Sequence, residues 1–137
     1  MKKNDLTPEQ YNVLAKGDTE MPFSGEYDDH YQKGIYVCGW CNNPLYTSEN
    51  KFDAHCGWPA FDDEIPGSVA RKLRPGEIYT EISCAHCGGH LGHVFNGEYL
   101  TDKNVRHCVN SVALKFIPEG QSLPPVADED ILINLKK

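Results

Sequence analysis

Long apolar runs and an excess of basic residues are both missing from this sequence of 137 residues. No apolar run approaches the roughly 20 residues that a membrane-spanning helix needs, so we expect no membrane insertion. The 13 Lys and Arg residues are outnumbered by 20 Asp and Glu residues, which gives a net charge of −7. Binding to nucleic-acid phosphates usually needs a basic surface, so we expect no nucleic-acid partner.

The first residues also lack the apolar core of a secretory signal peptide, so we expect a cytoplasmic protein. Disulfides are rare in that compartment. The six cysteines are therefore better interpreted as metal ligands, catalytic thiols or both. They lie at positions 38, 41, 56, 84, 87 and 108.

One short helix is predicted near the N-terminus. Thr7 can cap it, Pro8 suits its first position, and Gln10 can complete a capping box. Gly17 is a plausible stop. Only short strands are expected after this helix.

Local patterns beyond residue 33 are typical of β-structure. Apolar and β-prone residues predict strands at 34–37, 78–82 and 112–116. An Asn-Gly dipeptide between β-prone residues predicts a hairpin within 94–99. Many short strands punctuated by Gly and Pro indicate a mainly antiparallel β domain.

The composition changes after Ile117, where a linker rich in Pro and Gly precedes an acidic stretch. We therefore divide the chain into a domain at 1–117 and a C-terminal extension at 118–137. The apolar residues at 131–135 could add an edge strand to the domain or dock elsewhere.

Two C-x-x-C pairs, at 38–41 and 84–87, each follow a predicted strand. Four thiolates match a closed tetrahedral zinc site, which is a structural role. Iron–sulfur ligation uses the same ligands and stays open. A thioredoxin-like redox pair at 38–41 is less favoured, because Pro44 disfavours the helix that would lower the thiol pKa. The remaining alternative is that these four cysteines are buried in the core and bind no metal.

The remaining cysteines, Cys56 and Cys108, could each be a small buried hydrophobe. The surroundings of Cys108 argue for chemistry, because Arg106 lies two residues before it and a nearby cation stabilises a thiolate. On a strand, Arg106, Cys108 and Asn110 share one face, whereas His107 and Ser111 share the other.

Two further segments carry residues that could serve a site. Trp58 follows Cys56 in a loop rich in Gly and Pro, where it could present its indole or simply be buried. His90 and His93 could bind a second metal, act as acid and base, or fill hydrogen-bonding positions in a sheet. Their spacing alone does not choose among these roles.

Seven ordered motifs across residues 6–117 resemble the methionine-R-sulfoxide reductase B family. They are PFSG at 22–25, YVC at 36–38 with Cys41, CGWPAF at 56–61, TE at 80–81, Cys84 with Cys87, HLGHVF at 90–95 and RHCVNS at 106–111. Residues 96–105 depart from the pattern of many members, so the loop that faces the substrate is expected to differ. The resemblance says nothing about the extension.

The resemblance implies a mainly β fold of two antiparallel sheets with one or more short N-terminal helices, clamped by one structural zinc per chain. It implies that the zinc ligands are the four cysteines of the C-x-x-C pairs, Cys38, Cys41, Cys84 and Cys87. The activity it implies is peptide-methionine (R)-S-oxide reductase, a protein-repair reaction in oxidative stress. The expected substrates are proteins or peptides that contain methionine sulfoxide.

The resemblance also implies roles for the remaining site residues. Cys108 would be the nucleophile, becoming a sulfenic acid, and Cys56 would resolve it as a disulfide that thioredoxin reduces. His93 is our candidate acid. The other residues that match substrate-binding and active-site positions are His90, Asn110, Arg106 and, for substrate binding, Trp58.

Two other functions stay open at this point. A zinc-stabilised β module could bind a partner or small ligand without catalysis, in which case Cys108 would be inert. A thiol–disulfide exchanger could work through Cys38 and Cys41, in which case these thiols would carry no metal.

Overall fold

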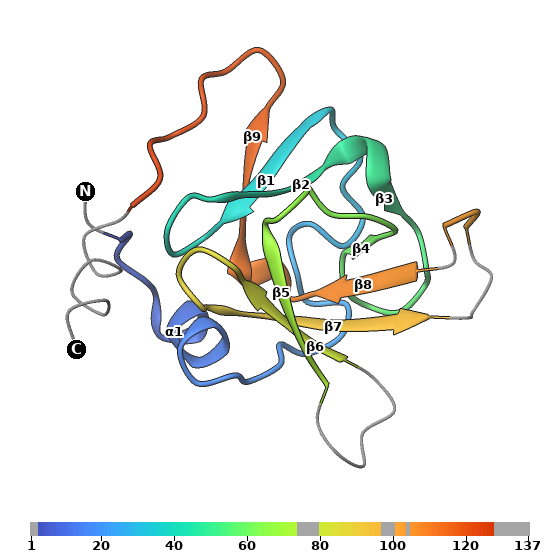
Figure 1. Cartoon of the computed structure of the whole chain (residues 1–137), viewed down its shortest axis with the longest axis horizontal. Coiled ribbons are helices and arrows are strands. Elements are labelled where there is room, and N and C mark those ends of the chain that lie inside the picture. The colour runs from blue at the N-terminus through green and yellow to red at the C-terminus, as the bar shows by residue number, and fades with distance from the viewer. Residues whose placement is uncertain (1–2, 74–79, 97–100, 104, 128–137) are drawn as a thin grey trace.

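The computed structural model describes residues 3–73, 80–96, 101–103 and 105–127 (Figure 1). This part of the chain folds into strands with one short helix, which confirms the predicted mainly β class. The elements in chain order are α1 (Pro8–Leu14), β1 (Gly34–Cys38), β2 (Pro44–Thr47), η1 (Ser48–Asn50), β3 (Lys51–Phe52), β4 (Ala60–Phe61), β5 (Val69–Leu73), β6 (Thr80–Cys84), β7 (His90–Asn96), β8 (Val105–Val109), η2 (Ser111–Ala113) and β9 (Leu114–Pro118).

Helix α1 begins where the sequence predicted. The Gln10 N–H donates to Thr7 Oγ1 at 3.2 Å, and the Thr7 N–H donates to Gln10 Oε1 at 2.8 Å, which completes the capping box. After the helix, Gly17 has φ +80°, a left-handed conformation that glycine adopts without steric cost. Val13 and Leu14 are buried and anchor the helix to the sheets.

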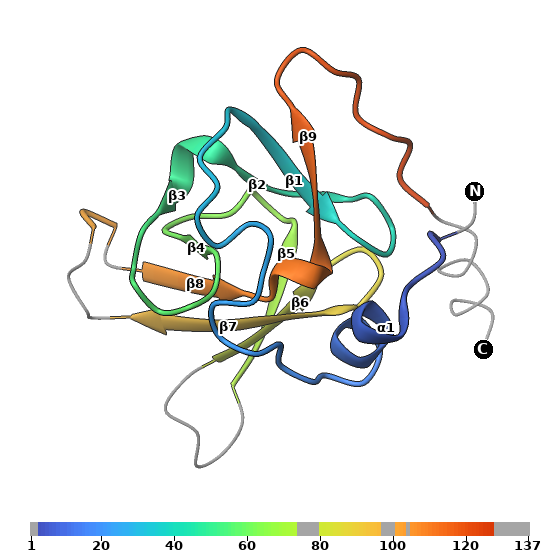
Figure 2. The same ribbon diagram turned by 180° about the vertical axis from the view of Figure 1, so that it is seen from behind.

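The strands form two antiparallel sheets (Figures 1 and 2). The smaller sheet has the order β2-β1-β9, and the larger has the order β3-β4-β8-β7-β6-β5. Strands β7 and β8 lie inside the larger sheet, so each is hydrogen-bonded on both sides. Their pairing sets His93 opposite Cys108, which brings two predicted site residues together.

Aromatic rings from both sheets form the centre of the core. Tyr36 and Tyr46 come from the smaller sheet, and Phe61 comes from the larger one. The rings of Tyr46 and Phe61 stack with centroids 4.3 Å apart, and Tyr36 meets Phe61 edge-on at 5.2 Å. Their complete burial ties the two sheets into one packed unit.

The strand predicted at 112–116 starts later than expected. Residues 111–113 form the 3-10 turn η2, and β9 begins at Leu114. The Val112 N–H donates to a Glu20 carboxylate oxygen at 2.9 Å, and the Ala113 N–H donates to the Asn110 carbonyl at 3.0 Å. These two N–H groups are therefore not available to pair with a neighbouring strand. The strand starts only at Leu114, although the apolar alternation begins at residue 112.

Parts of other predictions lie outside the described residues. The strand expected at 78–82 is observed as β6 from Thr80, with residues 78 and 79 not described. For the hairpin expected at 94–99, residues 97–99 are not described, and Asn96 pairs with Val105. The segment at 131–135 is also outside. The division at residue 117 stays a prediction.

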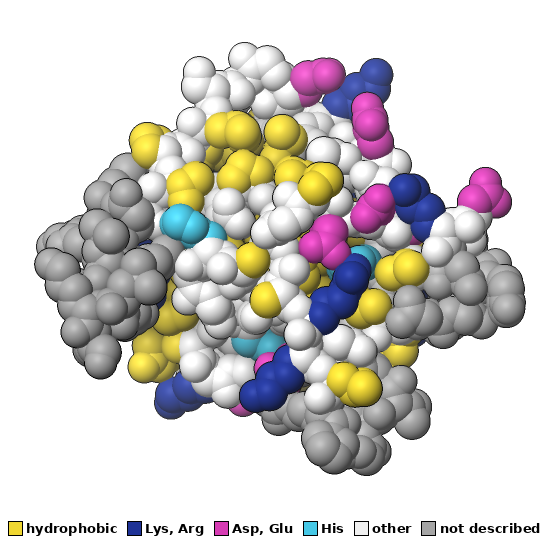
Figure 3. Space-filling view, viewed as in Figure 1, with side chains coloured by type: hydrophobic (Ala, Val, Ile, Leu, Met, Phe, Trp, Pro, Cys, Tyr) yellow, Lys and Arg dark blue, Asp and Glu magenta, His cyan; other side chains and the backbone are white. Residues whose placement is uncertain are grey.

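Acidic and basic side chains are interspersed on the face shown in Figure 3. Two ion pairs among the described residues join Arg71 to Glu64 at 2.6 Å and Lys103 to Asp63 at 2.8 Å. Exposed pairs of this kind contribute little stability. Among the described residues, no helix is long and apolar enough to span a membrane.

Candidate functional site

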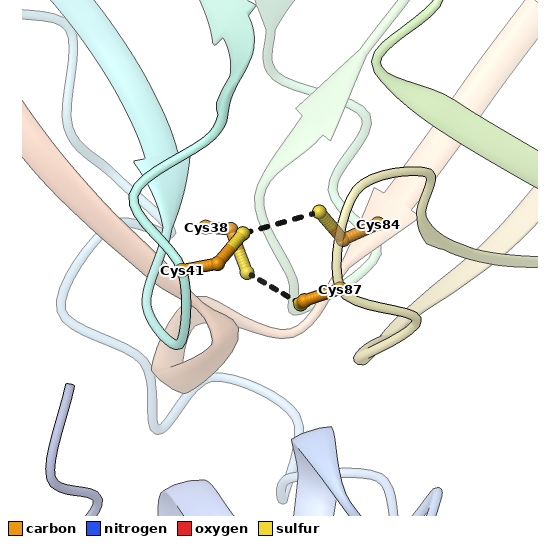
Figure 4. A group of neighbouring side chains, drawn as sticks. All are labelled: Cys38, Cys41, Cys84 and Cys87. Carbon is orange, nitrogen blue, oxygen red and sulfur yellow. Dashed lines mark hydrogen bonds between the residues drawn. The ribbon is translucent and has the colours of Figure 1, made fainter. Parts of the chain in front are cut away.

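The two C-x-x-C pairs meet in space although 42 residues separate them in the sequence (Figure 4). Cys38 and Cys84 end strands β1 and β6, and Cys41 and Cys87 lie in the turns that follow. The Sγ atoms of Cys38 and Cys87 are 3.7 Å apart, and those of Cys41 and Cys84 are 3.6 Å apart. All four sulfur atoms lie within 4.8 Å of one another.

The two cysteine turns have the same backbone pattern. The Asn42 N–H donates to the Cys38 carbonyl at 2.9 Å, and the Gly88 N–H donates to the Cys84 carbonyl at 2.8 Å. Asn42 and Gly88 both have positive φ, of 69° and 80°. Gly and Asn are the residues that tolerate this conformation, so the sequence allows both turns to fold back and present two sulfur atoms.

These four sulfur atoms fit a tetrahedral zinc ion. Zinc–sulfur bonds of about 2.3 Å place ligand sulfur atoms about 3.8 Å apart, close to the spacing observed. Four cysteines fill all positions of a structural site, which leaves none for substrate.

The remaining two cysteines form a second sulfur site. Cys108 is on β8, and Cys56 is in the loop between β3 and β4. Their Sγ atoms lie 3.1 Å apart. His55 and Gly57, which flank Cys56, have φ of 54° and 90°, and this sharply bent loop holds Cys56 over the strand. Cys108 is nearly buried and Cys56 is more accessible.

Arg106 shares a face of β8 with Cys108, as the strand alternation predicted. Its Nη1 atom is 3.0 Å from Cys108 Sγ, and its guanidinium lies 4.2 Å from the centre of the Phe95 ring. His107 points to the opposite side, where its Nδ1 atom is 2.9 Å from the Tyr46 hydroxyl. Burial, with Arg71 nearby, lowers the pKa of His107 to about 4, so this histidine is neutral at physiological pH.

The two thiols share one negative charge near neutral pH. The hydrogen bond from Cys108 lowers the pKa of Cys56 to about 6. The same hydrogen bond and burial raise the pKa of Cys108, and they outweigh the lowering effect of Arg106. Arg106 therefore does not by itself determine the charge on Cys108, because Cys56 also acts on its pKa. The charge belongs to the pair.

A cavity of about 450 Å³ opens onto this pair. Six predicted site residues line it together with Thr19, Gly92 and Phe95; they are Cys56, Trp58, His93, Arg106, Cys108 and Asn110. His90 is not among the lining residues. Its ring meets the His93 ring edge-on at 5.6 Å, and its Nδ1 atom is 3.5 Å from Glu81 Oε1.

Glu20 is a site residue that the sequence analysis missed. Its carbonyl accepts a hydrogen bond from Trp58 Nε1 at 3.0 Å, and its N–H donates to Asn110 Oδ1 at 2.8 Å. Glu20 thus fixes two side chains that line the cavity. These contacts join residues 38 and 90 positions apart, which no local pattern could reveal.

Gly92 is the second missed residue. A Cβ atom at this position would lie 1.9 Å from the Cys108 carbonyl oxygen, so any other residue would push β7 away from β8. A glycine inside an apolar strand often marks such a close backbone approach, and this signal was present between His90 and His93.

Comparisons with known proteins agree with this geometry. A protein-family model described as the SelR domain matches residues 6–118. The chain is 52% identical over 119 residues to "Peptide methionine sulfoxide reductase B2, chloroplastic" of Arabidopsis thaliana, covering 86% of this chain and 59% of that protein. It is 52% identical over 114 residues to "Peptide methionine sulfoxide reductase B5" of Oryza sativa subsp. japonica, covering 82% and 84% of the two chains. The chain thus spans less than two-thirds of the first relative.

Among solved structures, the fold is similar to that in "Crystal Structure of Mis18 'Yippee-like' Domain". The TM-score is 0.50 at 22% sequence identity, and the match covers 66% of this chain and all of that one. At this identity the similarity concerns the fold alone.

Proposed function

Since this chain belongs to the peptide methionine sulfoxide reductase B family, we propose that it reduces the R epimer of methionine sulfoxide in proteins and peptides to methionine. The observation that carries this proposal is the Cys108 thiol, set 3.1 Å from Cys56 and 3.0 Å from Arg106 at the wall of one cavity. A cavity of about 450 Å³ lies in the size range typical of ligand sites.

Cys108 is the proposed nucleophile. Its proton passes to Cys56 across 3.1 Å, which leaves the thiolate of Cys108 beside the Arg106 guanidinium. This thiolate attacks the sulfoxide sulfur. Trp58 packs against the methyl group of the substrate, and its ring is oriented by the hydrogen bond to the Glu20 carbonyl. Such packing can select one epimer, because it decides where the sulfoxide oxygen points.

His93 is the proposed acid. The sulfoxide oxygen gains negative charge during the attack and needs a proton, and His93 lines the cavity opposite Cys108 on the paired strand. The protonated oxygen then moves from the substrate sulfur to Cys108 Sγ. The bond between Cys108 and the substrate sulfur and the substrate sulfur–oxygen bond both break, so that methionine leaves and Cys108 becomes a sulfenic acid. His90 supports the His93 ring from behind, and Asn110 helps to orient the substrate.

Cys56 is the proposed resolving residue. Its sulfur attacks the Cys108 sulfenic acid, the sulfur–oxygen bond breaks, and the oxygen leaves as water, so that a Cys56–Cys108 disulfide forms. A dithiol protein, thioredoxin, then reduces this disulfide by exchange and becomes oxidised itself. The more accessible position of Cys56 makes its sulfur the easier one for an external thiol to reach. Action in the cytoplasm stays a prediction of the sequence.

We assign one zinc ion to Cys38, Cys41, Cys84 and Cys87. A bound zinc supplies a structural clamp and no chemistry at the substrate. Its ligands join the end of β1 in one sheet to the end of β6 in the other. Strand β6 pairs with β7, so the ligands support the strand that carries His93.

The proposal is tested by supplying the purified protein with each epimer of a peptide methionine sulfoxide and with dithiothreitol. We expect loss of the R epimer alone, with one methionine formed for each dithiol oxidised. The matched control is the Cys108→Ser variant, which should consume neither epimer. Consumption of the S epimer would refute the stereochemistry, and a zinc-loaded, folded protein that consumes neither would refute the reductase assignment.

A further inference from the structure

The described part of the C-terminal extension returns to the four-cysteine cluster. The matched family region ends at residue 118, and the chain then runs from β9 back toward the N-terminal segment, as both views show (Figures 1 and 2). It ends its described course at Ala127, which is fully buried and belongs to the main core.

Ala127 contacts both cysteine turns at once. Its N–H donates to the Cys41 carbonyl at 2.8 Å. Its carbonyl is 2.7 Å from His86 Nε2, in the turn between Cys84 and Cys87. A carbonyl can only accept, so the Nε2 atom of His86 carries the proton and donates it.

A third hydrogen bond adds to this bridge on the side of the first turn. The Asn42 amide donates to the Pro125 carbonyl at 3.1 Å. From the N-terminal side, the Asn4 amide donates to Asn42 Oδ1 at 2.7 Å, and the Asn4 N–H donates to the Trp40 carbonyl at 2.7 Å. The first turn is therefore held from two directions, and the C-terminal contacts continue through Ala127 to the second turn.

We propose that residues 125–127, here called the clasp, belong to the metal site and slow the loss of zinc by holding the two cysteine turns together. This rests on the zinc assignment under the proposed function. Zinc can leave only when its ligands separate, and separation requires one of the two Ala127 hydrogen bonds to break. Groups that bind the ligand-bearing segments from outside commonly tune metal affinity in this way.

The first test compares the full chain with a variant that ends at Leu123 and with a control that ends at Glu129. The control keeps the clasp and removes only residues beyond it. Each protein is loaded with zinc, and zinc transfer to a chromogenic chelator is followed at constant temperature. We expect transfer to be about tenfold faster without the clasp, because the two Ala127 hydrogen bonds that join the turns are lost. The control should lie within about twofold of the full chain.

A second pair of variants tests the bridge without shortening the chain. His86→Phe removes the donor to Ala127 and keeps a ring, whereas His86→Gln retains a donor. We expect faster zinc transfer from His86→Phe and a rate closer to the full chain for His86→Gln. The rate of global unfolding in urea with excess zinc is measured for all variants. If the clasp acts on the metal site, the variants that lose its contacts should release zinc faster than the full chain by a larger factor than the one by which they unfold faster.

Three outcomes would overturn the proposal. Equal transfer rates from the zinc-loaded proteins would refute the clasp and leave the zinc assignment intact. Equal acceleration of transfer and unfolding would show that the extension supports only general stability. A folded full chain that binds no zinc would refute the zinc assignment itself, and with it the clasp, whatever the epimer assay shows.

Discussion

The four-cysteine cluster and the Cys56–Cys108 pair hold sulfur atoms at similar distances, 3.6–3.7 Å in the cluster and 3.1 Å in the pair. Their surroundings differ. The cluster is enclosed by the core, with both termini of the described chain packed on its first turn. The pair opens onto a cavity and lies beside a guanidinium. Access and the source of positive charge, and not sulfur spacing, separate a metal site from a reactive site.

The source of positive charge explains how each group stays ionised. Thiolates inside the cluster need a cation among them, which a zinc ion would provide. In the pair, one thiol donates to the other, and Arg106 adds a fixed positive charge at 3.0 Å. A single charge on the pair needs no metal. The two groups should therefore respond differently when one sulfur atom is removed. Removal from the cluster should destroy the fold, whereas removal from the pair should leave the fold intact and change only the chemistry.

The largest expected effect is the loss of the folded state when one cluster ligand is removed. Cys87→Ser leaves three cysteine ligands, so zinc binds weakly and the protein loses the folding free energy that zinc binding supplies. That loss is large beside the total stability of a typical domain, which is about 5–15 kcal/mol. We expect zinc content near zero and no cooperative thermal transition. The control Cys56→Ser should retain one zinc per chain and a transition within a few degrees of the native one. A Cys87→Ser protein with a native transition would break the comparison.

The next largest effect is the loss of catalysis when the nucleophile is replaced. Cys108→Ser should lower the rate of sulfoxide reduction by at least about 10³-fold, because a serine hydroxyl is not ionised at neutral pH. Zinc content and thermal stability should not change, since Cys108 makes no contact with the cluster. The measurement is the single-turnover rate with the R epimer. Residual activity above about a tenth of the native rate would assign the chemistry elsewhere.

A smaller and more selective effect is expected at the resolving residue. Cys56→Ser should form one methionine per chain in a single turnover and then stop when thioredoxin is the reductant, because no disulfide can form. A small thiol in excess should restore part of the steady-state rate. Quantifying methionine at early times separates the first turnover from recycling. Normal recycling by thioredoxin would show that Cys56 is only a core thiol.

Local sequence patterns predicted the cluster well because its chemistry repeats at short range. Two C-x-x-C pairs, each after a strand, were enough to indicate a four-ligand site, and the capping box predicted the start of α1. Strand alternation placed Arg106 and Cys108 on one face. Each of these signals depends on neighbours within a few residues. The structure brings the four cysteines together, forms the capping box and places Arg106 beside Cys108, while the bound metal stays a proposal.

Apart from Gly92, whose local signal was present, the features that the sequence did not predict depend on distant contacts. The apolar alternation at 112–116 indicated a strand, but Glu20 captures the Val112 N–H from 92 residues away and the turn η2 forms instead. The same residue positions Trp58 and Asn110. Likewise, Cys56 was set apart from Cys108 in the sequence, so its effect on the thiol pKa was not foreseen.

The smallest effect concerns the charge on the pair and can be measured by alkylation with iodoacetamide, which reacts with thiolates. With the pKa of Cys56 at about 6, the rate should rise as the pH rises through about 6 and level off near pH 7. Cysteine groups bound to zinc should not react in this range.

The matched variant is Cys108→Ala, which removes the hydrogen bond that contributes most to lowering the pKa of Cys56. The midpoint should then move upward, toward that of a free cysteine, and alkylation at pH 7 should slow by about tenfold because the thiolate fraction falls. Mass spectrometry of the peptides identifies the residue that reacts. A native midpoint near 8.5 would show that the two thiols do not share a charge, and an unchanged midpoint in Cys108→Ala would assign the lowering to groups other than Cys108, such as the Trp58 backbone and Arg106. Either result would argue against this distinction, in which the four-cysteine cluster needs a metal ion to stabilise its thiolates and the Cys56–Cys108 pair stabilises a thiolate by the hydrogen bond between its two sulfur atoms.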